Sequence, residues 1–192
     1  MTEKIDQTVY FDKIGPENTD ATLELAFKRA KEIGIKDVVV ASTKGETGIK
    51  AAKIFKGFNL VVVSHSTGFR EPNTQEMSLD QRKEIEKEGG KVLTCQHALG
   101  GVGRAIRKKL GTYQMDEIIA YTLRILGEGT KVAVEIAMMA ADCGLIPTLS
   151  EIIAIGGTNS GADTALVLKP ANSQNFFDME IKEILCKPRN LK

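Results

Sequence analysis

The chain has few of the residues on which several classes of protein depend. Its 192 residues include no Trp, three Tyr and seven Phe, so aromatic residues make up only 5%. Single-stranded nucleic acids bind largely by stacking on aromatic side chains, and this scarcity argues against such a partner. Two His and three Cys, the latter Cys95, Cys143 and Cys186, are too few and too scattered for a metal centre or a disulfide framework. The sequence therefore predicts no metal site, and we expect the cysteines to be buried thiols.

An excess of one charge and a long hydrophobic run are also missing. The 26 Lys and Arg balance 25 Asp and Glu to a net charge of +1, whereas proteins that bind a phosphate backbone carry a clustered basic face. No segment approaches the roughly 18–20 apolar residues of a membrane span, and the N-terminus MTEKIDQTVY has no apolar signal region. We therefore expect neither a nucleic-acid nor a membrane partner, and a cytoplasmic location.

Short apolar runs alternate with helical patterns along the chain, which is typical of βαβ units. The sequence predicts one α/β domain over residues 1–192, with three layers and a mainly parallel sheet flanked by helices. Expected strands lie at 8–11, 37–41, 59–65, 91–95, 151–157, within 159–170 and at 176–188. Expected helices lie at 15–34, 46–57, 78–90 and 113–126. The segment 130–144 alternates like a strand at Val132, Val134 and Ile136, but its length and its Ala and Met content favour a buried helix.

Four of the expected strands are followed by small, hydroxylated or glycine residues. These segments are Ser42–Gly48, Ser64–Gly68, Gln96–Arg104 and Gly156–Asp163. In open α/β sheets the carboxyl ends of parallel strands meet at one edge, where ligands bind. The four segments together therefore predict a ligand site at that edge.

The turn Ser42–Gly48 has the composition of an anion site. A helix start offers free backbone N–H groups, and Ser and Thr hydroxyls add donors for a phosphate. The turn matches neither the P-loop nor the dinucleotide fingerprint, and Glu46 is awkward beside a phosphate. From these residues alone, a phosphate site and an ordinary strand-to-helix connection are equally open.

Other candidate residues also have two interpretations each. His65 and His97 follow expected strands and are either functional groups or structural hydrogen-bonding groups. Glu135 lies in an apolar run and is either a buried acid of raised pKa or a residue at an exposed or paired helix edge. Arg104, Arg107 and Lys108 are expected to form a solvated basic face. No Ser–His–Asp order or nucleophile elbow is present, so the catalytic residues, if any, stay unknown from the sequence.

Two stretches resemble the C-terminal α/β domain of pyruvate kinase. DVVVASTKGETGIKAAKIFKGFNLVVVSHSTGF has its apolar strand, Ser/Thr-Gly turn, short helix and second strand, and EIIAIGGTNSGADTALVLKP has its closing glycine-rich turn. The region of about 67–130 fits that domain less closely. Over nearly its full length the chain resembles a group of archaeal stand-alone proteins with this fold. The shared motifs are Tyr10–Thr19, Thr67-Gly68-Phe69, Met139–Pro147, Gly156–Ala165 and Asn175–Asn190.

The resemblance implies that the chain binds flavin mononucleotide (FMN), with its biochemical activity unassigned and a flavin-dependent redox reaction as one option. The implied contacts are Ser42, Thr43, Lys44, Gly45, Glu46, Thr47, His65, Ser66, Thr67, Gly68, Gly156, Gly157, Thr158, Gly161, Ala162 and Asp163. The alternative is a regulatory module that binds a sugar phosphate or another phosphorylated metabolite without catalysis. Whether the chain is an enzyme and whether it forms a homo-oligomer stay open.

Overall fold

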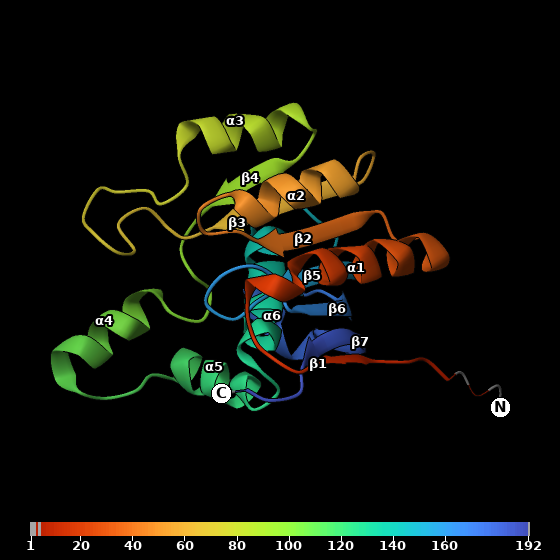
Figure 1. Ribbon diagram of the computed structural model, residues 1–192. Helices are drawn as coiled ribbons and strands as arrows, with labels where there is room; N and C mark the ends of the chain where they lie inside the picture. Colours follow the sequence, from red (N-terminus) through yellow and green to blue (C-terminus); the bar gives the residue numbers. More distant parts are fainter. Residues whose placement is uncertain (1–2, 4, 192) are drawn as a thin grey trace.

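The computed structural model describes residue 3 and residues 5–191, which form one seven-stranded sheet with helices on both faces (Figure 1). The strand order is β1-β7-β6-β5-β2-β3-β4. In chain order the strands are β1 Val9–Phe11, β2 Asp37–Ala41, β3 Asn59–Ser64, β4 Lys91–Thr94, β5 Ile152–Gly156, β6 Thr164–Lys169 and β7 Glu180–Pro188.

The sheet is mostly parallel, as expected. Strands β5, β2, β3 and β4 are parallel neighbours, and only β6 runs antiparallel to the strands on either side of it. The short strand β1 pairs in parallel with β7 at the edge of the sheet, which confirms the edge strand expected at 8–11. As a result, the carboxyl ends of four adjacent strands meet at one edge.

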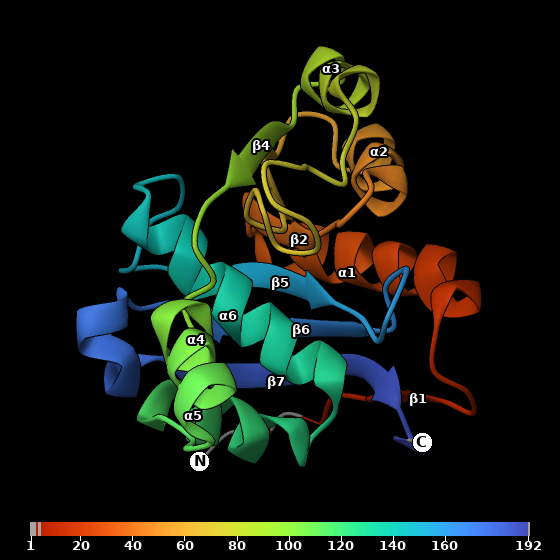
Figure 2. The ribbon, with the colours of Figure 1, turned by 90° about the vertical axis from the view of Figure 1, so that its left-hand side faces the viewer.

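The helices form the two outer layers. One face of the sheet is covered by α1 Thr19–Ile33, α2 Glu46–Ile54 and α3 Leu79–Lys87. The other face is covered by α6 Glu128–Asp142, which crosses β5 and β6 and carries α5 Met115–Arg124 on its outer side (Figure 2). Helix α4 Gly101–Leu110 contacts α5 and has no buried residue. The three-layer architecture is therefore confirmed.

Burial on both faces explains the uninterrupted apolar run of β2. Val38 and Val40 pack against α1 and α2, whereas Val39 packs against α6. All three side chains are fully buried. A central parallel strand has no solvent face, so its sequence is apolar throughout rather than alternating.

Most expected elements are confirmed, and some expectations are corrected. The helix expected at 130–144 is found as α6, which ends at Asp142, and it is buried on nearly every side between the sheet and α5. Residues 176–178 belong to a 3-10 helix, Ser173–Asp178, rather than to the last strand. The expectation of buried thiols holds for Cys186 but is wrong for Cys143, which is exposed beyond the end of α6. No helix within the described part of the chain is long and apolar enough to cross a bilayer.

Candidate ligand-binding site

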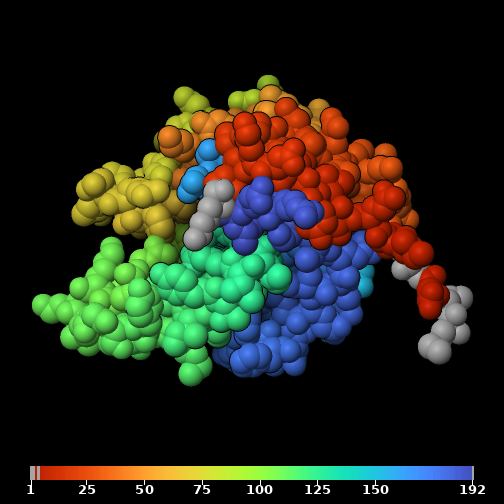
Figure 3. All heavy atoms as spheres, turned by 60° about the horizontal axis from the view of Figure 1, so that its bottom comes forward, coloured from red at the N-terminus to blue at the C-terminus, as the bar shows by residue number. Residues whose placement is uncertain are grey.

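A cavity of about 930 Å³ opens where β2, β3 and β5 end. Its walls come from the β2–α2 turn, the loop that follows β3, the turn after β5 and one side of α6. In the space-filling view, the projecting loop near residue 70 (yellow) and the α4–α5 region (green) are separated by a cleft (Figure 3). Of the residues implied by the resemblance, those on the lining are Ser42, Thr43, Lys44, Glu46, Thr47, His65, Gly157, Thr158 and Gly161.

The other implied residues lie outside the lining. These are Gly45, Ser66, Thr67, Gly68, Gly156, Ala162 and Asp163. Asp163 is fully buried, and its Oδ2 accepts hydrogen bonds from the backbone N–H groups of Gly15 and Thr158, each at 3.2 Å. Its Oδ1 accepts from the Thr164 hydroxyl at 2.9 Å. The Asp163 carboxylate therefore holds the turn after β5 in shape and does not face the cavity.

The β2–α2 turn presents the N-terminus of α2 to the cavity. The Gly48 N–H donates to Ser42 Oγ at 3.0 Å, which fixes Ser42 against the first helical turn. A Cβ at Gly48 would lie 2.6 Å from Val62 Cγ1, so glycine here allows α2 to approach β3 closely. The first N–H groups of a helix have no intrahelical partner and carry partial positive charge. The turn thus has the features of an anion site, with the Glu46 side chain exposed at its rim.

His65 is held at the end of β3 by two polar contacts. Its Nδ1 lies 2.6 Å from Glu76 Oε2 and its Nε2 lies 3.4 Å from Thr43 Oγ1. Burial lowers the pKa of His65, and the hydrogen bond to Glu76 opposes that shift without cancelling it. The neutral imidazole therefore predominates near pH 7, with one nitrogen directed at the β2–α2 turn.

Phe69 forms the aromatic part of the cavity wall. Its ring centroid lies 4.0 Å from that of His65 and 4.9 Å from that of His97, and the planes of Phe69 and His97 differ by 24°. The Arg104 guanidinium carbon lies 4.9 Å from the centre of the Phe69 ring. The sequence identified Phe69 only as part of a shared motif and not as a site residue.

His97, Glu135 and Lys131 form a buried polar cluster at the base of the cavity. The Glu135 side chain is 3% exposed, forms an ion pair with Lys131 Nζ and accepts a hydrogen bond from the Leu99 N–H at 2.9 Å. His97 Nδ1 lies 3.6 Å from Glu135 Oε2. Both ring nitrogens of His97 are buried without a hydrogen-bond partner among the described residues. Because Nδ1 faces Glu135, Nε2 is the nitrogen that is available to a bound molecule.

The buried carboxyl of Glu135 is an anion rather than an acid of raised pKa. Burial alone would raise its pKa, but His97 and Lys131 outweigh that effect and lower the pKa of Glu135 to about 2. The alternative of a raised pKa is therefore wrong, and Glu135 is a paired residue inside the protein. The sequence did not identify Lys131 because it gives no sign that this lysine is buried.

The geometry also corrects the expectation for Arg104. Arg104 lines the cavity beside Phe69, so it is not part of a purely solvated basic face. Arg70, Glu76 and Arg124 also line the cavity, although the sequence did not single them out. Within residues 3 and 5–191, no three His, Cys, Asp or Glu side chains are grouped to hold a metal ion.

The chain belongs to the family of the pyruvate kinase alpha/beta domain, whose model matches residues 20–168. Two solved structures are also similar to parts of it. O-ureido-L-serine synthase is 24% identical over 50% of this chain and 30% of that chain, with a TM-score of 0.31. Cryptosporidium parvum pyruvate kinase in complex with ADP is 13% identical over 87% of this chain, with a TM-score of 0.39. The present chain spans only 23% of that pyruvate kinase.

Proposed function

We propose that the protein binds a phosphorylated ligand with a flat ring, most simply FMN, in the large cavity. In this arrangement the phosphate lies at the N-terminus of α2 and the isoalloxazine ring lies beside Phe69. The observation that carries the proposal is that one cavity is lined by the hydroxyl-rich β2–α2 turn and by an aromatic wall. An ordinary strand-to-helix connection would not explain the aromatic wall.

The phosphate end is supported by the donors that face the cavity. Ser42, Thr43 and Thr47 line it together with the start of α2. Lys44 adds positive charge, whereas Lys50 is paired with Asp20. Charge-assisted hydrogen bonds to a phosphate contribute about 1.5–3 kcal/mol each. Glu46 can point to solvent from its exposed position, so it does not prevent a phosphate from binding.

The ring end is supported by Phe69 and by His97 Nε2, which has no hydrogen-bond partner among the described residues. An offset aromatic face stabilises a flat heterocycle by stacking. Buried polar groups are nearly always hydrogen-bonded, and the carbonyl and N–H groups of an isoalloxazine offer the partners that His97 lacks. A cavity of about 930 Å³ is also within the range of small-molecule sites, roughly 300–1,000 Å³. Bound FMN would supply electron transfer, with His97 Nε2 placed to hydrogen-bond its ring.

A fluorescence titration tests the proposal. We expect micromolar protein to quench FMN fluorescence, and the double variant Ser42→Ala/Thr47→Val to weaken binding by at least tenfold. Thr122→Ala is the matched control, because this hydroxyl bonds to the carbonyl of Ile118 within α5 and lies outside the cavity. No quenching, together with thermal stabilisation by sugar phosphates, would instead favour the regulatory module.

A further inference from the structure

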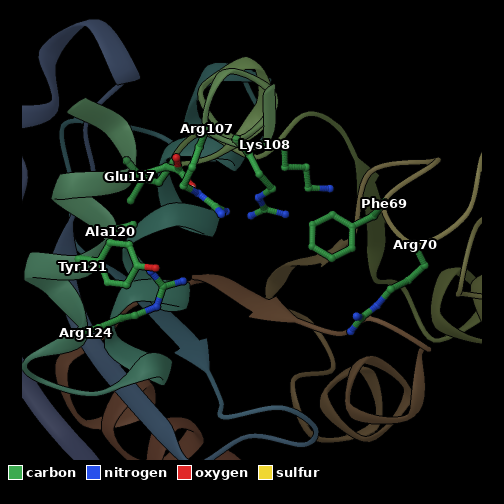
Figure 4. Close-up of a pocket in the computed structure, with 10 residues that line it drawn as sticks. Phe69, Arg70, Arg107, Lys108, Glu117, Ala120, Tyr121 and Arg124 are labelled. Carbon is green, nitrogen blue, oxygen red and sulfur yellow. The ribbon is translucent and has the colours of Figure 1, made fainter. Parts of the chain in front are cut away.

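A second cavity of about 340 Å³ lies beside the first, between the loop that carries Phe69 and the helices α4 and α5 (Figure 4). The two cavities share Phe69, Arg70, Arg104 and Arg124. In the close-up, side chains from the loop, α4 and α5 point into the same space. Two ligands bound in the two cavities would therefore be neighbours.

The lining of this second cavity is strongly cationic. It contains five cationic side chains and one carboxylate, whereas the whole chain has a net charge of only +1. The cations are Arg70, Arg104, Arg107, Lys108 and Arg124, and the carboxylate is Glu117. Like charges gathered in a concave site repel one another and raise the local concentration of anions.

Three of the cations have acidic partners and two do not. Arg107 Nε bonds to Glu117 Oε1 at 2.7 Å, and Arg124 bonds to Glu128. Arg70 lies 3.7 Å from a Glu76 oxygen. In the part of the chain described, Arg104 and Lys108 have no carboxylate within ion-pair distance. The cavity therefore holds an uncompensated positive charge.

Glu117 has a buried oxygen that a ligand of this cavity could hydrogen-bond. Its side chain is 8% exposed, and its Oε2 is buried without a hydrogen-bond partner among the described residues. Leaving a buried acceptor unpaired costs about 1–3 kcal/mol. A ligand that carries an O–H or N–H group beside its anionic group would satisfy this oxygen. The rings of Phe69 and Tyr121 also line this cavity.

We propose that this cavity binds a second ligand: a phosphorylated small molecule with an O–H or N–H donor, held by Arg104 and Lys108. The proposal goes beyond the flavin site, because it assigns a separate anion site to α4 and α5. It gives the protein two adjacent small-molecule sites, as a two-substrate enzyme or an effector-controlled protein requires.

Calorimetric titration with inorganic pyrophosphate and with ADP tests the site, and citrate serves as the carboxylate probe. We expect both phosphorylated probes to bind, ADP more tightly than pyrophosphate, and Lys108→Gln to weaken each by about tenfold or more. Lys109→Gln is the matched control: it removes the same charge from the next position of α4, which is exposed and lines neither cavity. It should leave the affinities within about twofold.

The outcomes separate this proposal from the flavin proposal. Pyrophosphate binding that is lost in Ser42→Ala/Thr47→Val but kept in Lys108→Gln would place the probe at α2 and overturn the second site. Equal losses in Lys108→Gln and Lys109→Gln, or tighter binding of citrate than of both phosphorylated probes, would also overturn it. Binding of pyrophosphate that depends on Lys108 supports the second site whether or not FMN binds.

Discussion

At the residue scale, His65 is subject to two opposing effects. Burial lowers its pKa below the ordinary value of 6.5, and Glu76 raises it. We therefore predict that Glu76→Gln lowers the pKa of His65 further. Burial and the electrostatic effects of His97 and Arg70, all of which lower this pKa, would then be less opposed. A pH titration of the imidazole resonances by NMR measures this, and the chain simplifies the assignment because it has two histidines. His97→Gln identifies the remaining signal, and a pKa above 6.5 in the wild-type protein would contradict the account.

The low pKa of Glu135 makes the free energy of unfolding depend on pH in acid. Its pKa is about 2 in the folded protein against an ordinary value of 4.5, so the folded state favours the carboxylate. The resulting stabilisation is fully present above about pH 4.5 and is lost as the pH falls toward 2. We predict that the free energy of unfolding falls more steeply over this interval in the wild-type protein than in Glu135→Gln. Denaturant unfolding at several pH values measures both slopes, and parallel curves would contradict this prediction.

The residues of the site differ in how far the sequence could predict them. Ser42, Thr43 and Thr47 lie in a turn whose composition and position after a strand indicate an anion site. The cluster of His97, Glu135 and Lys131 could not be found this way. Lys131 and Glu135 lie one turn apart on α6, but His97 comes from a distant segment and meets them only through the packing of α6. The sequence alone does not reveal that Lys131 is buried.

At the element scale, the position of α6 depends on a close approach to β5. A Cβ at Gly156 would lie 2.3 Å from the backbone oxygen of Gly129. A backbone atom cannot move aside as a side chain can, so Gly156→Ala must displace α6 together with Lys131 and Glu135. We predict a loss of about 1–3 kcal/mol in unfolding free energy and weaker ligand binding, measured by denaturant unfolding and titration.

Gly103→Ala is the comparison for this change. Gly103 lies within α4, and the atoms nearest to its new Cβ would be those of the Asp116 carboxylate, which can rotate away. Alanine also has the higher helix propensity, by about 1 kcal/mol. We expect Gly103→Ala to be near neutral, and equal destabilisation by the two substitutions would show that the approach of α6 to β5 is not special.

The sequence predicted most elements because their patterns are local. The apolar run of β2 is found in the structure, and the helix expected at 78–90 is found as α3, which begins with a capping box of Ser78 and Gln81. The alternation in residues 130–144 was ambiguous, since a helix buried on nearly every side has no polar stripe to reveal its period. The packing of this segment against the sheet and α5 favours the helix over the strand.

At the scale of the whole molecule, the parallel order of β5, β2, β3 and β4 brings the strand ends together, as the βαβ pattern predicts. The second cavity could not be predicted in the same way. It depends on how α4 and α5 lie relative to the loop that carries Phe69, and α4 has no buried residue to specify its docking. The fold family alone does not assign an activity to either cavity.

The central claim is that a phosphate at the N-terminus of α2 anchors a flavin whose ring lies beside Phe69. Calorimetric comparison of FMN with riboflavin, which lacks the phosphate, tests it most directly. We predict that the wild-type protein binds FMN at least tenfold more tightly than riboflavin, and that Ser42→Ala/Thr47→Val removes most of this difference. Equal affinities for the two flavins in the wild-type protein would contradict the account.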